Sequence, residues 1–479
     1  MADHPDAPAP DTGRVEPSGR QGDVNPPPGA ASLGAHSVIY LLGTALQGLG
    51  VLLVLPFATR LLGEAEYGKV ATALVVVQMV GTVAAAGLPQ VILREYHRGD
   101  DGPTAGRALA GTMVGLAVAL AVLGVALGAV LSATGRVDLG QWCLVVVASA
   151  ALTTVVAGQS LSRARLRPFH FLALAIVSTV VAHLSGLLAA QGDRSSRTYL
   201  TAYAAALVVA AVLALVVGRP LPPTAARQRV RAGVRLAAPL LPQAVAMLGL
   251  LMGDVLLANR LLGDAAAGSY QVALQIGNIP FVLAVALFNG WSPLVLSRPL
   301  ADRWAWARRS GTALLTVVVV GAGLVAGVSY WVSFVLAGEG FDVGAIGGAA
   351  ALLTFVAVLY MLYQGSSLAV LDSERTGWLA AGALAGLAVM AALAVLLAPD
   401  LSLAGVALAK VAGYLTLTAV TVWVGRRELR WPVEAWLAVA VAVVATVLSL
   451  HYLSGVLAVV LLLVGGAIIA PRVLRTLRG

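Results

Sequence analysis

The sequence predicts an all-α, polytopic membrane protein, and three observations carry this prediction. Of the 479 residues, 59% are hydrophobic and 11% are charged, whereas a soluble globular chain carries about 25% charged residues. The apolar residues form runs long enough to cross a hydrocarbon core, which takes roughly 20 helical residues. A connection between two of these runs also occurs a second time later in the chain. A soluble surface cannot be built from this composition, so we expect the chain to lie in a membrane.

Fourteen apolar segments are predicted as transmembrane helices, with boundaries good to about three residues. They lie at 36–58, 70–93, 108–133, 140–161, 170–190, 198–218, 236–258, 269–296, 310–336, 344–370, 378–398, 402–424, 433–453 and 455–471. Residues 1–34 precede them and are rich in proline, which predicts a disordered cytoplasmic tail.

The repeated connection divides the chain into two similar halves. Residues 58–74, the first copy, and residues 258–274, the second copy, are identical at nine of seventeen positions. The offset covers six predicted spans, an even number, so both halves enter the membrane with the same polarity, as in the parallel repeats of secondary transporters. The sequence therefore predicts an N-lobe at 35–218, a cytoplasmic linker at 219–235 and a C-lobe at 236–424. Residues 425–479 are expected to add spans 13 and 14 and a cytoplasmic tail.

Basic residues predict the orientation. With the N-terminus inside, 24 of the 31 Lys and Arg residues fall on the cytoplasmic side and 6 fall outside, with Lys410 inside a span. Cytoplasmic loops of membrane proteins are enriched in these residues, so both termini are expected in the cytoplasm. The same loops, facing an anionic leaflet, explain the net charge of +9. No nucleic-acid partner is expected.

We expect no enzyme activity, cofactor or metal site. The letters from Gly63 to Lys69 resemble a phosphate-binding loop, but Val70 stands where that loop needs Ser or Thr. The motif also follows a membrane helix instead of a strand. The six histidines are dispersed along the chain.

Three ionisable residues inside predicted spans are singled out: His183 in span 5, Asp254 in span 7 and Lys410 in span 12. Such a group costs roughly 3 kcal/mol or more in hydrocarbon, so it usually faces a cavity and often has a function. Asp254 and His183 are candidates for coupling transport to an ion. The alternatives are a helix–helix hydrogen bond for Asp254, a snorkelling side chain for Lys410 and a packing histidine at His183.

Other polar residues could line a cleft between the lobes. Amides occur within the spans, and each could instead join two helices. Arg60 and Arg260 occupy equivalent places in the two copies, at the outer ends of spans 1 and 7. Two guanidinium groups could hold a diphosphate bidentately, or each could snorkel at a helix end.

Several of these stretches resemble one family. From Ala58 to Gly68 the chain follows the pattern L-x-R-x-L-G-x-x-x-Y-G, with Ala58 for the leading Leu. The second lobe opens with prolines and the run from Asp254 to Tyr270, and span 2 ends in Ile92-Leu93-Arg94. Over residues 35–425 the chain resembles polysaccharide and lipid-linked oligosaccharide flippases. These belong to the multidrug/oligosaccharidyl-lipid/polysaccharide (MOP) superfamily. One departure is Ala267, where the first copy has Tyr67.

The resemblance implies a flippase in the bacterial cytoplasmic membrane that works by alternating access. Its substrate would be an oligosaccharide or polysaccharide precursor linked to undecaprenyl (pyro)phosphate. The implied partners are this lipid-linked glycan, membrane lipids, a coupling cation or proton, and a glycan polymerase or glycosyltransferases. The candidates for binding the substrate are Arg60, Arg94, Arg260, Lys410, Gln47, Gln78 and Asn278.

Two other functions stay open at this point. The first is an ion-coupled drug or metabolite antiporter of the same superfamily. Such antiporters usually carry a carboxylate in the first lobe's cavity, and predicted spans 1–6 contain no Asp or Glu. The second is a membrane enzyme or non-transporting scaffold of cell-envelope glycan assembly. An enzyme of that kind tends to have a large outer loop with Arg and His, which this sequence lacks.

Overall fold

A computed structural model describes residues 30–85, 87–238, 241–373 and 375–450, and for residues 30–50 it describes mainly the backbone. The predicted N-terminal tail lies almost entirely outside these residues, as does predicted span 14. In the described residues, ten helices are long and apolar enough to cross a membrane, and a shorter apolar helix follows them. The all-α, multi-pass architecture predicted from composition is confirmed.

The first lobe contains seven α-helices and one π-helical turn, and an amphipathic linker follows it. The lobe comprises α1 (Ala30–Ala84), α2 (Leu88–Tyr96), α3 (Gly102–Ala133), α4 (Leu139–Ala164), α5 (Pro168–Ile176), η1 (Val177–Val181), α6 (Ala182–Ala189) and α7 (Ser196–Gly218). The linker forms η2 (Pro223–Ala226) and α8 (Arg227–Ala237). Helix α8 buries Val230, Gly233 and Ala237 and packs on α2 and α3, so the linker belongs structurally to the N-lobe.

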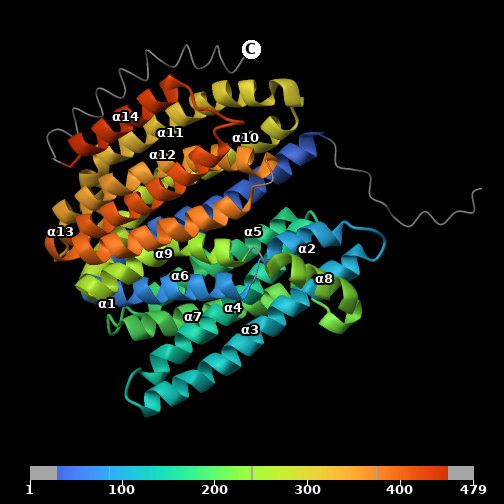
Figure 1. The fold of residues 1–479 in the computed structure, drawn as a ribbon. Coiled ribbons are helices and arrows are strands. Elements are labelled where there is room, and N and C mark those ends of the chain that lie inside the picture. Colours follow the sequence, from blue (N-terminus) through green and yellow to red (C-terminus); the bar gives the residue numbers. More distant parts are fainter. Residues whose placement is uncertain (1–29, 86, 239–240, 374, 451–479) are drawn as a thin grey trace, which may run out of the picture.

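The second lobe contains five long helices, and a shorter one packs against it. They are α9 (Leu241–Leu262), α10 (Asp264–Leu296), α11 (Leu300–Leu336), α12 (Val343–Asp372), α13 (Gly377–Gly425) and α14 (Val433–Leu448). Helix α14 packs on α11 and α12 and corresponds to predicted span 13. In Figure 1 the helices α3, α4 and α7 lie at the bottom and α11, α12 and α14 at the top.

Two helices each cover two predicted spans. Helix α1 contains the non-helical residue Gly63, with φ 74° and ψ 176°, at the predicted connection between spans 1 and 2. Helix α13 contains Ser402, with φ 49° and ψ −127°, at the predicted connection between spans 11 and 12. Predicted span 2 also ends early, because Gly87 adopts φ 68° before α2. Positions with positive φ, such as Gly63 and Gly87, favour glycine because it has no Cβ atom to cause a steric clash there.

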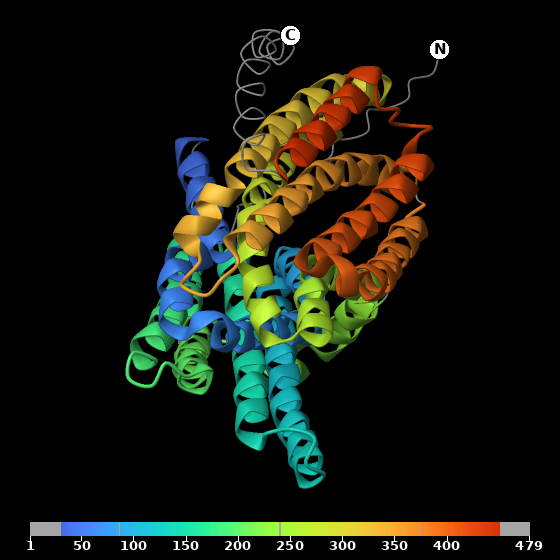
Figure 2. The ribbon, with the colours of Figure 1, turned by 90° about the vertical axis from the view of Figure 1, so that its left-hand side faces the viewer.

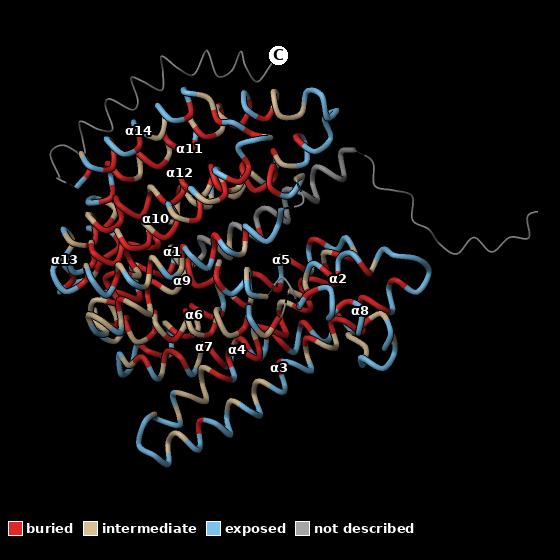
Figure 3. Tube along the Cα trace, in the orientation of Figure 1, coloured by how far each residue is buried: buried red, intermediate tan, exposed pale blue. Residues whose placement is uncertain are grey.

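The surface of the lobes is largely apolar. The hairpin of α3 and α4 projects from the bundle in Figure 2, and much of α3 is exposed in Figure 3. Large apolar side chains are exposed there, among them Val122, Leu123 and Val130. Soluble monomers rarely expose contiguous apolar surface of this extent. Such a surface fits contact with lipid chains.

The lobes meet through α1, which packs against α10 and α9 and also touches α11. One buried apolar cluster belongs to both lobes at this contact: it includes Leu62 and Tyr67 from α1 together with Val255 and Tyr270 from α9 and α10. A second cluster, around Leu109, is confined to the N-lobe and α8. The clusters around Trp291 and Leu250 are confined to the C-lobe and α14. The shared core therefore lies around the two copies of the repeat, and we call that end of the molecule the repeat end.

Candidate functional site

The two copies of the repeat contact each other, backbone against backbone. A Cβ atom added to Gly68 would lie 1.7 Å from the carbonyl oxygen of Asp264, and one added to Gly268 would lie 2.5 Å from the carbonyl oxygen of Glu64. These distances are too short for any side chain. Small residues allow membrane helices to approach closely, and here the equivalent glycine of each copy makes the same approach. The repeated glycine thus forms a close backbone contact between the lobes.

Hydrogen bonds surround this glycine contact and also join the lobes. The Ser269 hydroxyl donates to the Glu64 carboxylate. The Thr59 hydroxyl donates to the carbonyl of Leu336 at 2.7 Å. Arg60 Nη2 donates to the carbonyl of Val335 at 2.7 Å. Three polar groups of the first copy therefore bind partners in the C-lobe.

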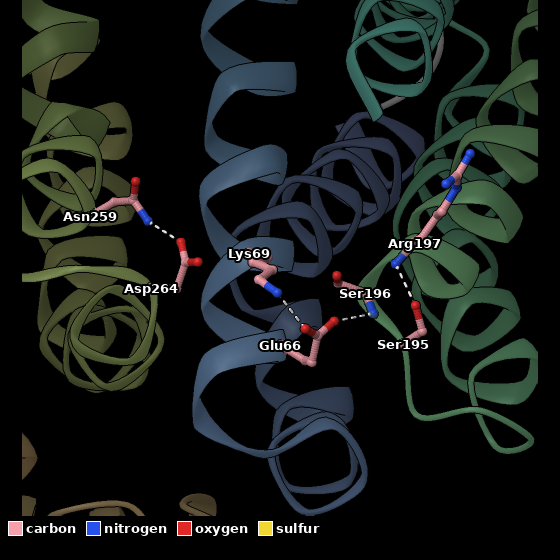
Figure 4. A network of polar contacts seen from close by, with 7 residues as sticks. All are labelled: Glu66, Lys69, Ser195, Ser196, Arg197, Asn259 and Asp264. Atoms are coloured by element: carbon pink, nitrogen blue, oxygen red, sulfur yellow. Dashed lines mark hydrogen bonds and ion pairs between the residues drawn. The ribbon is translucent and has the colours of Figure 1, made fainter. Parts of the chain in front are cut away.

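Glu66 ties the first copy to the N-terminus of α7. Its carboxylate accepts a hydrogen bond from Lys69 Nζ at 2.6 Å and another from the backbone N–H of Ser196 at 2.8 Å. In Figure 4 Glu66 lies on α1 facing α7, while Asp264 of the second copy accepts from Asn259 on the other side of α1. A carboxylate near a helix N-terminus is stabilised by the exposed N–H groups there.

A buried ion pair lies inside the C-lobe. Lys410 Nζ on α13 lies 2.9 Å from Asp254 Oδ2 on α9, and the two side chains are 2% and 0% exposed. Lys410 also donates to the carbonyl of Leu251 at 2.8 Å, and the Tyr270 hydroxyl donates to Asp254 Oδ2 at 2.8 Å. Asp254 Oδ1 is buried and has no hydrogen-bond partner among the described residues. Removing either partner would leave an uncompensated charge, which costs about 3–5 kcal/mol.

The N-lobe contains a neutral counterpart around His183. This residue is buried, and its Nδ1 lies 2.8 Å from the hydroxyl of Tyr199. Its ring also packs on Tyr203. The π-helical turn η1 directly precedes α6, which carries His183. Short π-helical turns inside membrane helices occur frequently at functional sites, so His183 stays a candidate for ion coupling.

The structure brings some of the predicted site residues together and separates others. Asp254 and Lys410, predicted for different roles, form one ion pair. Within the described residues no hydrogen bond or ion pair joins His183 to this pair. Arg260 is exposed at the end of α9, and Arg94 is exposed on α2. Gln78 and Asn278 are half-buried, and the side chain of Gln47 lies outside the described residues.

Sequence reasoning did not find several of the residues that make these contacts. Tyr270 binds Asp254 across sixteen positions of sequence, and Ser269 binds Glu64 across the lobes. The signal that could have found Gly68 and Gly268 was already present, because both glycines stand at the same place in the repeat. In the part of the chain that the structure describes, no group of three or more His, Cys, Asp or Glu side chains could hold a metal ion.

Comparison with known families decides the family of the chain. Residues 33–295 match the model of a family described as "Polysaccharide biosynthesis protein". The chain belongs to this family. The match covers more than half of the sequence and confirms the family resemblance expected from the repeated motif. No curated protein matches the sequence.

Solved structures share the fold. A structure described as "Lipid II flippase MurJ, inward closed conformation" superposes with a TM-score of 0.65 at 11% identity, covering 93% of this chain and 100% of that chain. An inward-facing multidrug resistance MATE family transporter of the MOP superfamily superposes with a TM-score of 0.56 at 14% identity, covering 82% of this chain and 97% of that chain. This polysaccharide biosynthesis protein therefore has the fold of MOP transporters.

Proposed function

We propose that this protein is a flippase that carries a glycan precursor, linked to undecaprenyl (pyro)phosphate, across the bacterial cytoplasmic membrane by alternating access. The observation that carries the proposal is the contact between the two copies of the repeat. It joins the lobes through a shared core at the repeat end, while the other apolar cores belong to one lobe each. The family supports a glycan substrate, and the similarity to a lipid II flippase supports a lipid-linked one.

The contact at the repeat end supports a specific sequence of states. In the present state Gly68 and Gly268 touch, and Ser269, Thr59 and Arg60 complete the closure. To release a substrate at this end, the lobes must separate there and meet at the opposite end. The headgroup would pass between the lobes while the lipid chain stays in the bilayer.

Arg260 is the stronger of the two arginine candidates for binding a diphosphate. Arg60 donates to Val335 and to Pro56, both backbone carbonyls, so it acts in the contact between the lobes. Arg260 has no hydrogen bond or ion pair among the described residues, so its guanidinium fork is available. A bidentate contact to phosphate needs this fork, which lysine lacks. Lys410 is paired with Asp254 and supports the coupling site better than the substrate site.

The test is delivery of a lipid-linked sugar in proteoliposomes, read by a probe that reaches one leaflet. The purified protein should deliver the substrate, and empty vesicles should not. Arg260→Lys should lower delivery about tenfold, the effect expected when one charge-assisted hydrogen bond is lost. The thermal unfolding temperature should stay unchanged. No delivery by the wild-type protein with several polyprenyl-linked glycans would leave a scaffold as the better explanation. Near-normal delivery by Arg260→Lys would remove this residue from the substrate site.

The proposed orientation places the repeat end outside and both termini in the cytoplasm. The charge asymmetry between alternate connections supports it, because basic loops stay inside. A reporter active only outside should give a signal when fused after Asp138 or Gly192, and none after Gly479. A signal at Gly479 or silence at the other two sites would overturn this topology. Glycosyltransferases or a polymerase would then act on the substrate on either side of the membrane.

An ion-coupled antiporter is the second candidate function. Two observations favour it: the buried Asp254 with one unpartnered oxygen, and the fold shared with a multidrug resistance transporter. Both functions predict that Asp254→Asn lowers transport driven by an ion gradient. They differ in substrate, so the discriminating measurement is uptake of cationic drugs by the same vesicles. Drug uptake without glycan delivery would select the antiporter.

A further inference from the structure

A basic cavity lies in the N-lobe, outside both the contact between the lobes and the buried ion pair. It has a volume of about 750 Å³ and is lined by the ends of α2, α4 and α7, the start of α3, the α4–α5 turn and the start of α5. Among the described residues that line it, none is acidic. The basic side chains and imidazoles that line it are His97, Arg107, Arg165, Arg167, His170 and Arg219.

Two of these arginines are fixed by the end of α7. Arg165 donates from Nη1 to the carbonyl of Val217 at 3.0 Å and from Nη2 to that of Gly218 at 2.7 Å. Arg107 Nε donates to the carbonyl of Arg219 at 2.8 Å. Cations at a helix C-terminus are stabilised by its free carbonyls. These bonds hold both guanidinium groups at the cavity, and each keeps further N–H groups for another acceptor.

Capping of α7 does not account for Arg167 and His170, which also line the cavity. The Arg167 side chain forms no hydrogen bond or ion pair with the described residues, although its backbone N–H donates to the carbonyl of Ser162. His170 Nδ1 is shielded from solvent and has no partner among them. Buried polar atoms in proteins are nearly always hydrogen-bonded. An exposed arginine and an unsatisfied imidazole nitrogen in one cavity indicate that an anion completes the site.

The rim of the cavity is apolar and exposed. Leu166 and Val216, which line the cavity, are 52% and 63% exposed. Phe169 precedes the lining residue His170 in the sequence and is 70% exposed. In a membrane protein, exposed apolar side chains contact lipid chains, and basic residues beside them lie at the level of the headgroups. An exposed apolar rim would contribute nothing to the binding of a water-soluble anion. The combination fits a molecule that carries both a phosphate and hydrocarbon chains.

We propose that this cavity binds the phosphate headgroup of a membrane lipid, with the chains of that lipid running along Leu166, Phe169 and Val216. A second basic cavity, between α2 and α8, offers a useful contrast. It has a volume of about 470 Å³ and includes Arg94, Arg98 and Arg229, but it also includes Glu95. That carboxylate lies 3.4 Å from Arg98 and 3.9 Å from Arg229. One carboxylate there is paired with two of the three arginines, whereas the cavity at Arg167 has no acidic lining residue.

The experiment is native mass spectrometry of the full chain in detergent, with added dioleoyl phosphatidylglycerol or dioleoyl phosphatidylcholine. The wild-type protein should retain phosphatidylglycerol preferentially, and Arg167→Gln should reduce this retention about tenfold. Arg308→Gln is the matched control, because Arg308 is exposed on α11 in the other lobe and the charge change is the same. The Arg167 side chain makes no hydrogen bond or ion pair within the described protein, so Arg167→Gln should leave the thermal unfolding temperature unchanged.

Three results would overturn the inference. They are equal retention of the two phospholipids, equal effects of Arg167→Gln and Arg308→Gln, and displacement of the lipid by inorganic pyrophosphate as readily as by a lipid phosphate. A competition arm with undecaprenyl diphosphate identifies the natural source. Displacement of phosphatidylglycerol assigns the cavity to the polyprenyl carrier, and persistence assigns it to a phospholipid; both results support a lipid-phosphate site. Transport is not measured, so the outcome is independent of the proposed flippase activity.

Discussion

In the first copy of the repeat, four side chains reach partners outside the copy: Thr59, Arg60 and Glu64 reach the C-lobe, and Glu66 reaches α7. In the second copy, Asp264 binds Asn259 within the copy itself, and alanine stands at position 266. The backbones nevertheless agree, since Gly63 has φ 74° and Gly263 has φ 93°. Duplication has thus kept the turn and the glycine contact, while the polar contacts have diverged.

The lobes differ in the same way deeper in the membrane. The C-lobe buries Asp254 and Lys410, whereas Val54 occupies the place in the N-lobe that is equivalent to Asp254. The N-lobe instead buries the neutral pair of His183 and Tyr199. The shared features therefore describe the fold, and the unshared ones are the better candidates for coupling. The following variants test this division, from the largest expected effect to the smallest.

Loss of either charge of the buried pair should have the largest effect. Lys410→Met leaves Asp254 buried without a counter-charge and should lower the free energy of unfolding by about 3–5 kcal/mol. The double variant Asp254→Val, Lys410→Met replaces the pair by apolar side chains, with the valine matching Val54 of the N-lobe, and should regain most of that stability while losing gradient-driven transport. Thermal unfolding in detergent and transport in vesicles measure the two properties separately. A double variant that transports normally would return the pair to a structural role.

The glycine contact should be equally sensitive from both sides. Gly68→Ala and Gly268→Ala each force a methyl group into a backbone contact, and we expect each to cost about 1–3 kcal/mol. The matched control is Gly115→Ala on α3, where a Cβ atom meets nothing within 4 Å and alanine favours the helix. If Gly68→Ala melts at the wild-type temperature, the lobes do not depend on this contact for closure.

The pair of His183 and Tyr199 in the N-lobe should show an effect no larger than that of the glycine contact. Tyr199→Phe removes the partner of His183 Nδ1 and leaves a buried nitrogen unsatisfied, which costs about 1–3 kcal/mol. Tyr203→Phe is its control, because Tyr203 packs on the imidazole through its ring and a phenylalanine keeps that contact. Equal melting temperatures of these two variants would show that the hydrogen bond contributes little.

Glu66→Gln should have the smallest effect. The amide oxygen can still accept from Ser196, and the ion pair with Lys69 is partly exposed, so the expected cost is about 0–1 kcal/mol. Glu339→Gln, an exposed change in the connection between α11 and α12, controls for the loss of a negative charge. A loss above about 2 kcal/mol would mean that the first copy depends on its side chains more than the second copy does.

The sequence predicted the features that depend on composition and periodicity. The apolar runs predicted the helices, and the repeated stretch contains residues through which α1 contacts α9 and α10. The connections between spans 1 and 2 and between spans 11 and 12 were predicted as breaks between helices. In the structure, helix continues on both sides of a single non-helical residue, Gly63 or Ser402. A single residue with positive φ is enough to interrupt a helix, and the hydropathy of the sequence does not show which residue that is.

The candidate site was predictable as a set of residues but not as a set of contacts. Asp254 and Lys410 were both identified because charges inside apolar runs are rare. Their pairing depends on the packing of α9 against α13, which no spacing within either helix encodes. The basic cavity was not predicted, because its arginines come from connections that looked like ordinary positive loops until α3, α4 and α7 brought them together.

The contact of Gly68 with Gly268 has a consequence for motion. Helices that meet through side chains interdigitate, and turning one against the other requires new rotamers or a new register. Helices that meet at glycine have no interdigitating side chains at the point of contact. They can roll about the crossing point until neighbouring side chains stop them. While the repeat end is closed, the glycine crossing would serve as a pivot, and a small rotation about it would cause the largest displacement at the opposite end of the lobes.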